Sequence, residues 1–91
     1  MNRVIWTPLA EKKRDAALDY IALDNVRAAL SQLGEIERQA DRLLEHPNMG
    51  RPGKIRGTRE LVIRHTPYII GYRVKGDVVQ IVRFLHSAQN R

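Results

Sequence analysis

The chain of 91 residues contains no cysteine, which excludes disulfide bridges, thiol catalysis and cysteine-based zinc sites and fits a reducing compartment. No apolar run approaches the roughly 20 residues that span a bilayer, and the N-terminus lacks the apolar stretch of a signal peptide. We therefore expect a soluble, cytoplasmic protein without a membrane partner. A chain this short buries only about 60 to 65% of its unfolded surface, so we expect one domain over residues 1–91.

Acidic side chains are scarce in the second half of the chain. Residues 1–50 carry seven basic and eight acidic side chains, whereas residues 51–91 carry nine basic and two acidic ones, a net charge of +7. This asymmetry favours a polyanion or an acidic protein as the partner. The alternative is a basic surface that only keeps the protein soluble.

Two segments have the periodicity of helices. Residues 8–23 follow Thr7, a good N-cap, and residues 26–44 follow Asn25 with apolar side chains recurring at spacings of three and four. The short connection between them predicts an antiparallel helical hairpin. Gly34 lies inside the second helix at a cost of about 1 kcal/mol relative to alanine, which we attribute to a close approach of the first helix.

The other periodic segments are β-prone. Residues 3–6, 58–64, 67–74 and 78–85 are rich in β-branched and aromatic side chains, and residues 75–77, Lys-Gly-Asp, predict a tight hairpin. The first strand needs a partner, so we expect it to join the sheet at an edge. The fold class is α+β, with the order β-α-α-β-β-β: an antiparallel twisted sheet with the helical hairpin packed on one face.

Strand alternation predicts which side chains share a face of the sheet. One face would hold Tyr68, Ile70, Tyr72, Val74, Val79, Ile81, Arg83 and Leu85. The other would hold Ile69, Gly71, Arg73, Val78, Gln80, Val82, Phe84 and His86. The first face is the better core. The second predicts an exposed apolar patch of Ile69, Val82 and Phe84 for a protein partner, unless the C-terminal tail of the chain covers part of it.

Side chains suited to catalysis are few. The three histidines show no metal-ligand spacing, and no second carboxylate accompanies Glu60 or Asp77 as an acid/base pair. We expect neither a metal nor a cofactor. What remains is a basic set, comprising Arg51, Lys54, Arg56, Arg59, Arg73, Arg83 and His86. Arginine binds phosphate or carboxylate bidentately and histidine titrates near neutral pH, although solvated loop cations and a structural role for His86 remain open.

Three motifs in this order carry a resemblance. The chain has G-x-R at residues 57–59, Y-x-x-x-Y-R-V at residues 68–74 and R-x-L-H at residues 83–86, all after a predicted helical hairpin. Together they resemble the toxins of the RelE/ParE superfamily of type II toxin-antitoxin systems, over nearly the whole chain. The resemblance implies the fold inferred above, a cognate antitoxin protein as partner, and roles in growth arrest and plasmid stabilisation.

The superfamily divides by target. RelE-like members are ribosome-dependent endonucleases that cut messenger RNA, and ParE-like members poison DNA gyrase. In the RelE branch an arginine occupies the position of Ile69, and the tail is basic and ends in tyrosine; this chain has neither feature. The resemblance is therefore closer to ParE.

These comparisons of motifs predict a ParE-like gyrase poison, which is not an enzyme, neutralised by an antitoxin that binds Ile69, Val82 and Phe84. The target would be bound by Arg51, Lys54, Arg56, Arg59, Arg73 and Arg83. The alternative is a RelE-like, metal-independent endoribonuclease acting on the ribosome and messenger RNA, with Arg59, Arg83 and His86 as catalytic residues. A second alternative is a non-toxic binding module.

Overall fold

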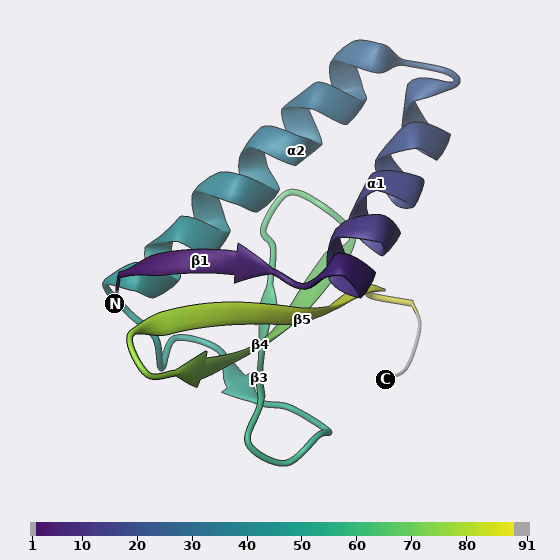
Figure 1. Ribbon diagram of the computed structural model, residues 1–91. Helices are drawn as coiled ribbons and strands as arrows, with labels where there is room; N and C mark the ends of the chain where they lie inside the picture. Colours follow the sequence, from purple (N-terminus) through teal and green to yellow (C-terminus); the bar gives the residue numbers. More distant parts are fainter. Residues whose placement is uncertain (1, 89–91) are drawn as a thin grey trace.

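The computed structural model describes residues 2–88, so residues 1 and 89–91 of the predicted domain lie outside the described residues. A five-stranded mixed sheet carries a helical hairpin on one face, as Figure 1 shows. Within residues 2–88, no helix is long and apolar enough to cross a membrane.

The element order confirms the predicted fold class and adds one short strand. The elements are β1 (Arg3–Trp6), α1 (Pro8–Ala22), α2 (Val26–Asp41), a 3₁₀ turn η1 (Arg42–Leu44), β2 (Arg51–Pro52), β3 (Arg59–Val62), β4 (Tyr68–Lys75) and β5 (Val78–His86). The added strand, β2, lies in a segment rich in glycine and proline that carries no strand pattern. It is defined by its partner, β3, and not by its own sequence.

Both helices begin at the predicted caps. The Thr7 hydroxyl accepts a hydrogen bond from the Ala10 amide at 3.4 Å, and the Asn25 side chain accepts one from the Ala28 amide at 3.0 Å. These bonds satisfy amides that have no partner within the helix. They fix where each helix starts, and the hairpin then packs across the sheet.

The strands lie in the order β1-β5-β4-β3-β2. The first strand joins the sheet at an edge, as predicted. It runs parallel to β5, whereas the other neighbours are antiparallel, so the sheet is mixed and not antiparallel throughout as expected. No tight hairpin connects β1 to β5, so nothing in the connection forces the antiparallel direction on this pair. The main core lies between the sheet and the hairpin. Its most buried large side chains include Ile36, Leu43, Ile70, Tyr72 and Ile81.

A β-bulge in β5 corrects the predicted faces. Gly71 pairs with Arg83, but the next residue, Tyr72, pairs with Ile81, so Val82 is an extra residue in β5. An extra residue inverts the alternation beyond it. Phe84 therefore lies on the helix side of the sheet, 5% exposed, while Arg83 lies on the opposite side; the alternation rule placed both on the wrong face.

The environment of Gly34 also differs from the prediction that the first helix approaches it closely. The glycine is exposed, and a Cβ added to it would have nothing within 4 Å. The first helix does not approach it closely, so the structure offers no packing reason for glycine here.

We predict that Gly34→Ala stabilises the protein by about 1 kcal/mol, because alanine has the higher helix propensity and meets no obstacle. Thermal unfolding should shift upward by about 4 to 8 °C. Gly50→Ala is the contrasting variant, since its Cβ would lie 2.7 Å from both the Glu60 carbonyl oxygen and the Tyr72 ring. It should destabilise the protein, and equal effects of the two variants would contradict the geometry.

Candidate functional site

The sheet face opposite the helices, here called the open face, is predominantly basic. Its charged side chains come from all five strands and comprise Arg3, Arg51, Glu60, Arg73, Lys75 and Arg83. One carboxylate thus lies among five basic side chains. The open face is therefore suited to contact an anionic surface.

Glu60 is the centre of the charged cluster on the open face. Its carboxylate lies 3.4 Å from the Arg51 guanidinium and 3.9 Å from the Arg83 guanidinium, and its side chain is 11% exposed. Arg83 also lies over Gly71, where an added Cβ would come within 3.0 Å of the Arg83 Cβ. The absence of a side chain at Gly71 therefore leaves room for Arg83 of the neighbouring strand.

Arg59 is on the opposite side of the sheet from this cluster. It pairs with Tyr72, and its guanidinium donates to the Gly50 carbonyl oxygen at 2.8 Å. The Tyr72 hydroxyl donates to the Pro47 carbonyl at 2.7 Å and accepts from the Gly50 amide at 2.9 Å. Arg59 and Tyr72 together hold the segment that leads into β2, which gives Arg59 a structural role.

His86 lies at the far end of β5. Its ring meets Tyr68 edge to face at 5.9 Å between centroids, and its Nδ1 accepts a hydrogen bond from the Ala88 amide at 3.1 Å. His86 and Tyr68 line a groove of about 410 Å³ with Lys13 and Tyr20 of α1. The groove thus brings a histidine, two tyrosines and a lysine together on the helix side of the sheet.

The structure therefore does not unite Arg59, Arg83 and His86. Arg83 is on the open face, and the other two are on the helix side. Arg59 pairs with Tyr72 and His86 with Tyr68, four residues apart along β4, which corresponds to roughly 13 Å of strand. One scissile phosphate cannot contact all three side chains in this arrangement.

The predicted antitoxin patch is not one exposed surface either. Phe84 packs in the core against Tyr68, with 4.8 Å between ring centroids. Ile69 is on the open face, as predicted, but is 1% exposed between Val62 and Leu85 of the neighbouring strands. Val82 is the bulge residue and is half-buried beside α1. The roles of these residues in antitoxin binding stay untested, but their placement excludes a shared exposed patch.

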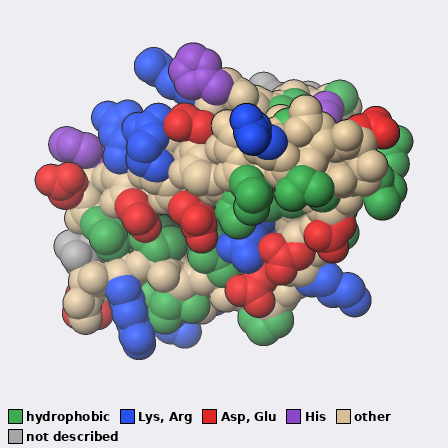
Figure 2. All heavy atoms as spheres, turned by 90° about the horizontal axis from the view of Figure 1, so that it is seen from above, with side chains coloured by type: hydrophobic (Ala, Val, Ile, Leu, Met, Phe, Trp, Pro, Cys, Tyr) green, Lys and Arg blue, Asp and Glu red, His purple; other side chains and the backbone are tan. Residues whose placement is uncertain are grey.

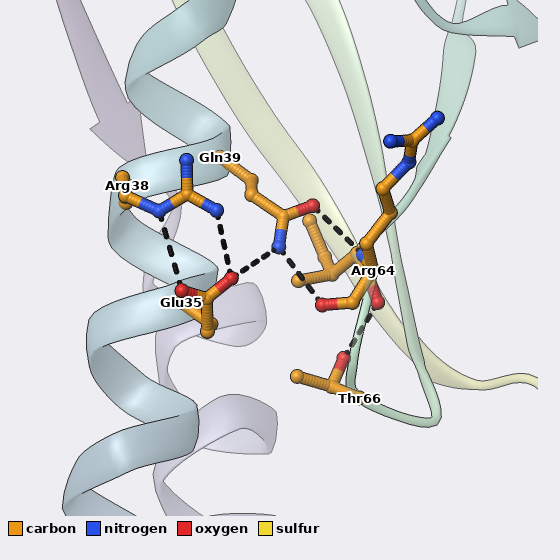
Figure 3. A network of polar contacts seen from close by, with 6 residues as sticks. Glu35, Arg38, Gln39, Arg64 and Thr66 are labelled. Atoms are coloured by element: carbon orange, nitrogen blue, oxygen red, sulfur yellow. Dashed lines mark hydrogen bonds and ion pairs between the residues drawn. The ribbon is translucent and has the colours of Figure 1, made fainter.

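The sequence reasoning missed a polar network between α2 and the turn after β3 (Figure 3). The Gln39 side chain is 5% exposed; its amide donates to the Arg64 carbonyl and accepts from the Arg64 amide, at 2.8 and 2.7 Å. Glu35 accepts from both Arg38 and Gln39 at 2.8 Å. The hydrogen bonds from Arg38 and then Gln39 lower the pKa of the Glu35 carboxyl. No spacing rule identifies a glutamine that bonds a backbone 25 residues away.

Two further groups stand out at the surface. The end of the hairpin exposes Tyr20, Leu23, Val26 and Leu30, and Figure 2 shows hydrophobic side chains among acidic ones over this side. At the outer edge of β3, Arg42, Arg51 and Arg64 line a pocket of about 400 Å³. Arg42 and Arg64 were not predicted, because they belong to different segments that meet only in the folded chain.

Known proteins are similar to this chain in sequence. A family model described as the ParE toxin of type II toxin-antitoxin system, parDE, matches residues 4–91. "Putative toxin Y4kP" of Sinorhizobium fredii is 41% identical over 88 residues, covering 97% of this chain and 91% of that protein. "Toxin RelE2" of Caulobacter vibrioides is 37% identical over 89 residues, covering 98% and 99%.

The solved structures agree. The chromosomal ParDE TA system from P. aeruginosa contains a chain with a TM-score of 0.81 and 31% identity, covering 92% of this chain and 94% of that one. The fold and the matches define a toxin of the RelE/ParE superfamily, as the motifs indicated. The chain belongs to the ParE toxin family of type II toxin-antitoxin systems.

We predict that Tyr72→Phe destabilises the protein by about 1 to 3 kcal/mol, because it leaves the Gly50 amide and the Pro47 carbonyl without their partner. Urea unfolding followed by circular dichroism measures the loss. Tyr20→Phe is the matched control, since Tyr20 is 77% exposed and should change nothing. Equal stability of the two variants would show that the hydroxyl bridge is unimportant.

Alkaline pH should also destabilise the fold. Burial raises the pKa of Tyr68 and of Tyr72. Below the ordinary tyrosine pKa of about 10, both tyrosines are neutral in the folded and in the unfolded protein. Their ionisation therefore does not change the stability in that pH range. Above about pH 10 the unfolded chain ionises first, and stability falls. We expect a smaller decline for Tyr68→Phe than for wild type in urea unfolding between pH 8 and 11.

Proposed function

We propose that this toxin arrests growth by poisoning DNA gyrase in the cytoplasm, through binding and not through RNA cleavage, and that a cognate antitoxin neutralises it. The separation of Arg59, Arg83 and His86 carries the proposal. A ribonuclease needs phosphate-binding and acid/base groups around one phosphate. In residues 2–88 these three predicted groups are divided between two faces of the sheet.

The environment of Ile69 supports the same choice. This residue occupies the position where RelE-like enzymes carry an arginine, and an isoleucine side chain offers no donor to an anion. It is 1% exposed, so its position is part of the packing and not of an accessible site. The similarity to the ParE family model over residues 4–91 points in the same direction.

The target-binding surface in this proposal is the open face and the loop beside it. Arg51, Arg73 and Arg83 lie on that face, and Lys54 and Arg56 are exposed in the loop between β2 and β3. Arg59 was predicted to bind the target, but we do not include it in the proposed surface, because its guanidinium donates a hydrogen bond to the Gly50 carbonyl. The gyrase–DNA complex is anionic along its DNA, which suits a basic surface.

A ribosome-dependent endonuclease is the second candidate, favoured by one observation. His86, Tyr68 and Lys13 line the same groove, and such groups can move protons and bind an anion. The 37% identity to "Toxin RelE2" adds weight to it. A non-toxic module is the third candidate, and growth on induction of the protein separates it from both toxins.

We predict that adding the purified toxin to gyrase, ATP and supercoiled plasmid causes cleaved plasmid to accumulate. In a separate assay on translating ribosomes, we expect the toxin to leave messenger RNA intact. His86→Gln, which cannot titrate, should retain most of the gyrase effect. A nuclease would behave differently, since losing acid/base help costs about 10² to 10⁴ in rate. Cleavage of messenger RNA by wild type that His86→Gln abolishes would overturn the proposal in favour of the second candidate.

A further inference from the structure

The pocket at the outer edge of β3 has the features of a binding site. It has a volume of about 400 Å³ and lies between the end of α2 and the edge of the sheet. Its lining includes Arg42, Met49, Arg51, Glu60, Val62 and Arg64. Three arginines and one carboxylate thus surround a single concavity.

The arginines around this pocket are not balanced by acidic groups. Arg51 lies 3.4 Å from Glu60, but Glu60 is shared with Arg83 on the open face. The side chains of Arg42 and Arg64 form no ion pair or hydrogen bond with any residue of the described chain. In Figure 3 the Arg64 guanidinium points away from the Gln39 network. Like charges around a concavity repel one another, so an anion in the pocket would be stabilised.

The backbone at the same place has an unused pair of groups. The Ile63 amide bonds the Tyr68 carbonyl of β4, so alternation directs the Val62 amide and carbonyl to the outer edge. On that edge Glu60 is paired with β2, and the Arg64 amide and carbonyl are bonded by Gln39. Val62, between them, has no partner on this edge in residues 2–88. Of these three residues, only Val62 has outward backbone groups that are left unpaired within residues 2–88.

The exposed side chains around this gap are apolar. Val62 is 47% exposed and Met49 is 38% exposed. An unpaired strand edge can bind an extended peptide that adds to the sheet as a further strand. The apolar and cationic side chains beside this edge would contact apolar and acidic side chains of such a peptide. A nucleic acid would use the arginines, but it cannot satisfy both the donor and the acceptor of Val62 with a main chain in register.

We propose that this pocket binds an acidic, extended segment of the antitoxin, one residue of which pairs with the Val62 backbone. Carboxylates on either side of that residue contact Arg42, Arg51 and Arg64, and apolar side chains cover Val62 and Met49. This inference rests on the antitoxin partner of the proposed function but does not depend on gyrase as the target. It moves the antitoxin site from the sheet face to the sheet edge.

The first test is charge reversal. The affinity of the double variant Arg42→Glu/Arg64→Glu for the antitoxin encoded with the toxin is measured by calorimetry, with Arg73→Glu/Lys75→Glu as the matched control. Both variants change the net charge equally at exposed positions. We expect the pocket variant to lose about 100-fold or more in affinity, since unpaired interfacial charges are costly, and the control less than 10-fold. Equal losses, or no loss in the pocket variant, would overturn the proposal.

The second test concerns the backbone. Val62→Pro removes the outward amide without breaking a bond to β4, because proline is tolerated where the amide of an edge strand faces solvent. We expect it to weaken antitoxin binding about 10-fold, whereas Val62→Thr keeps the amide and binds as wild type. Thermal unfolding of each variant shows whether the fold is retained. Wild-type affinity of a folded Val62→Pro protein would exclude strand pairing at this edge.

A third measurement separates the two kinds of macromolecule. A short DNA duplex is titrated with the same proteins. If the pocket variant lost DNA binding but kept its antitoxin affinity, the pocket would be a nucleic-acid site and the proposal would be wrong. Gyrase assays on the wild type are independent of all three tests, so failure of the gyrase proposal leaves the antitoxin result interpretable.

Discussion

One extra residue in β5 determines what each side of the sheet can do. The bulge at Val82 shifts the register between Gly71 and Tyr72, so the last part of the strand presents the opposite side chains to the helices. Phe84 then completes the core with Trp6 and Tyr68. Arg83 moves to the open face and meets Glu60. Without the bulge a guanidinium would be buried and an aromatic ring would face water, and both cost free energy.

The opposite edge of the sheet depends on the Tyr72 hydroxyl. It bonds the Pro47 carbonyl and the Gly50 amide and therefore positions the chain that enters β2. Arg59 adds a bond to the Gly50 carbonyl. Two residues predicted from sequence as core and as target-binding thus act together to hold a loop, and the loop carries Arg51 to the border between the open face and the pocket.

Local signals were sufficient for the helices and for the order of the main elements along the chain, because caps at Thr7 and Asn25 and the tight turn at 75–77 act over a few residues. The site was less predictable. A bulge has no marker in the sequence of β5, so the predicted faces were inverted for residues 83–86, which follow it. Gln39 and the arginine pocket depend on contacts between distant segments, which periodicity does not describe. Motif resemblance supplied the family but could not show that Arg59 bonds a backbone carbonyl.

The two proposed surfaces share one carboxylate, which couples them. Glu60 lies between Arg51, which lines the pocket, and Arg83, which lies on the open face. An antitoxin carboxylate that binds Arg51 competes with Glu60 for that guanidinium and leaves Glu60 to pair more fully with Arg83. Arg83 is then less available to an anionic target. By linkage the effect is reciprocal, because a target that engages Arg83 releases Glu60 to Arg51 and weakens the hold of the pocket on an acidic segment. Arg51 itself belongs to both surfaces, so neutralisation in this arrangement combines direct competition for Arg51 with the indirect effect on Arg83.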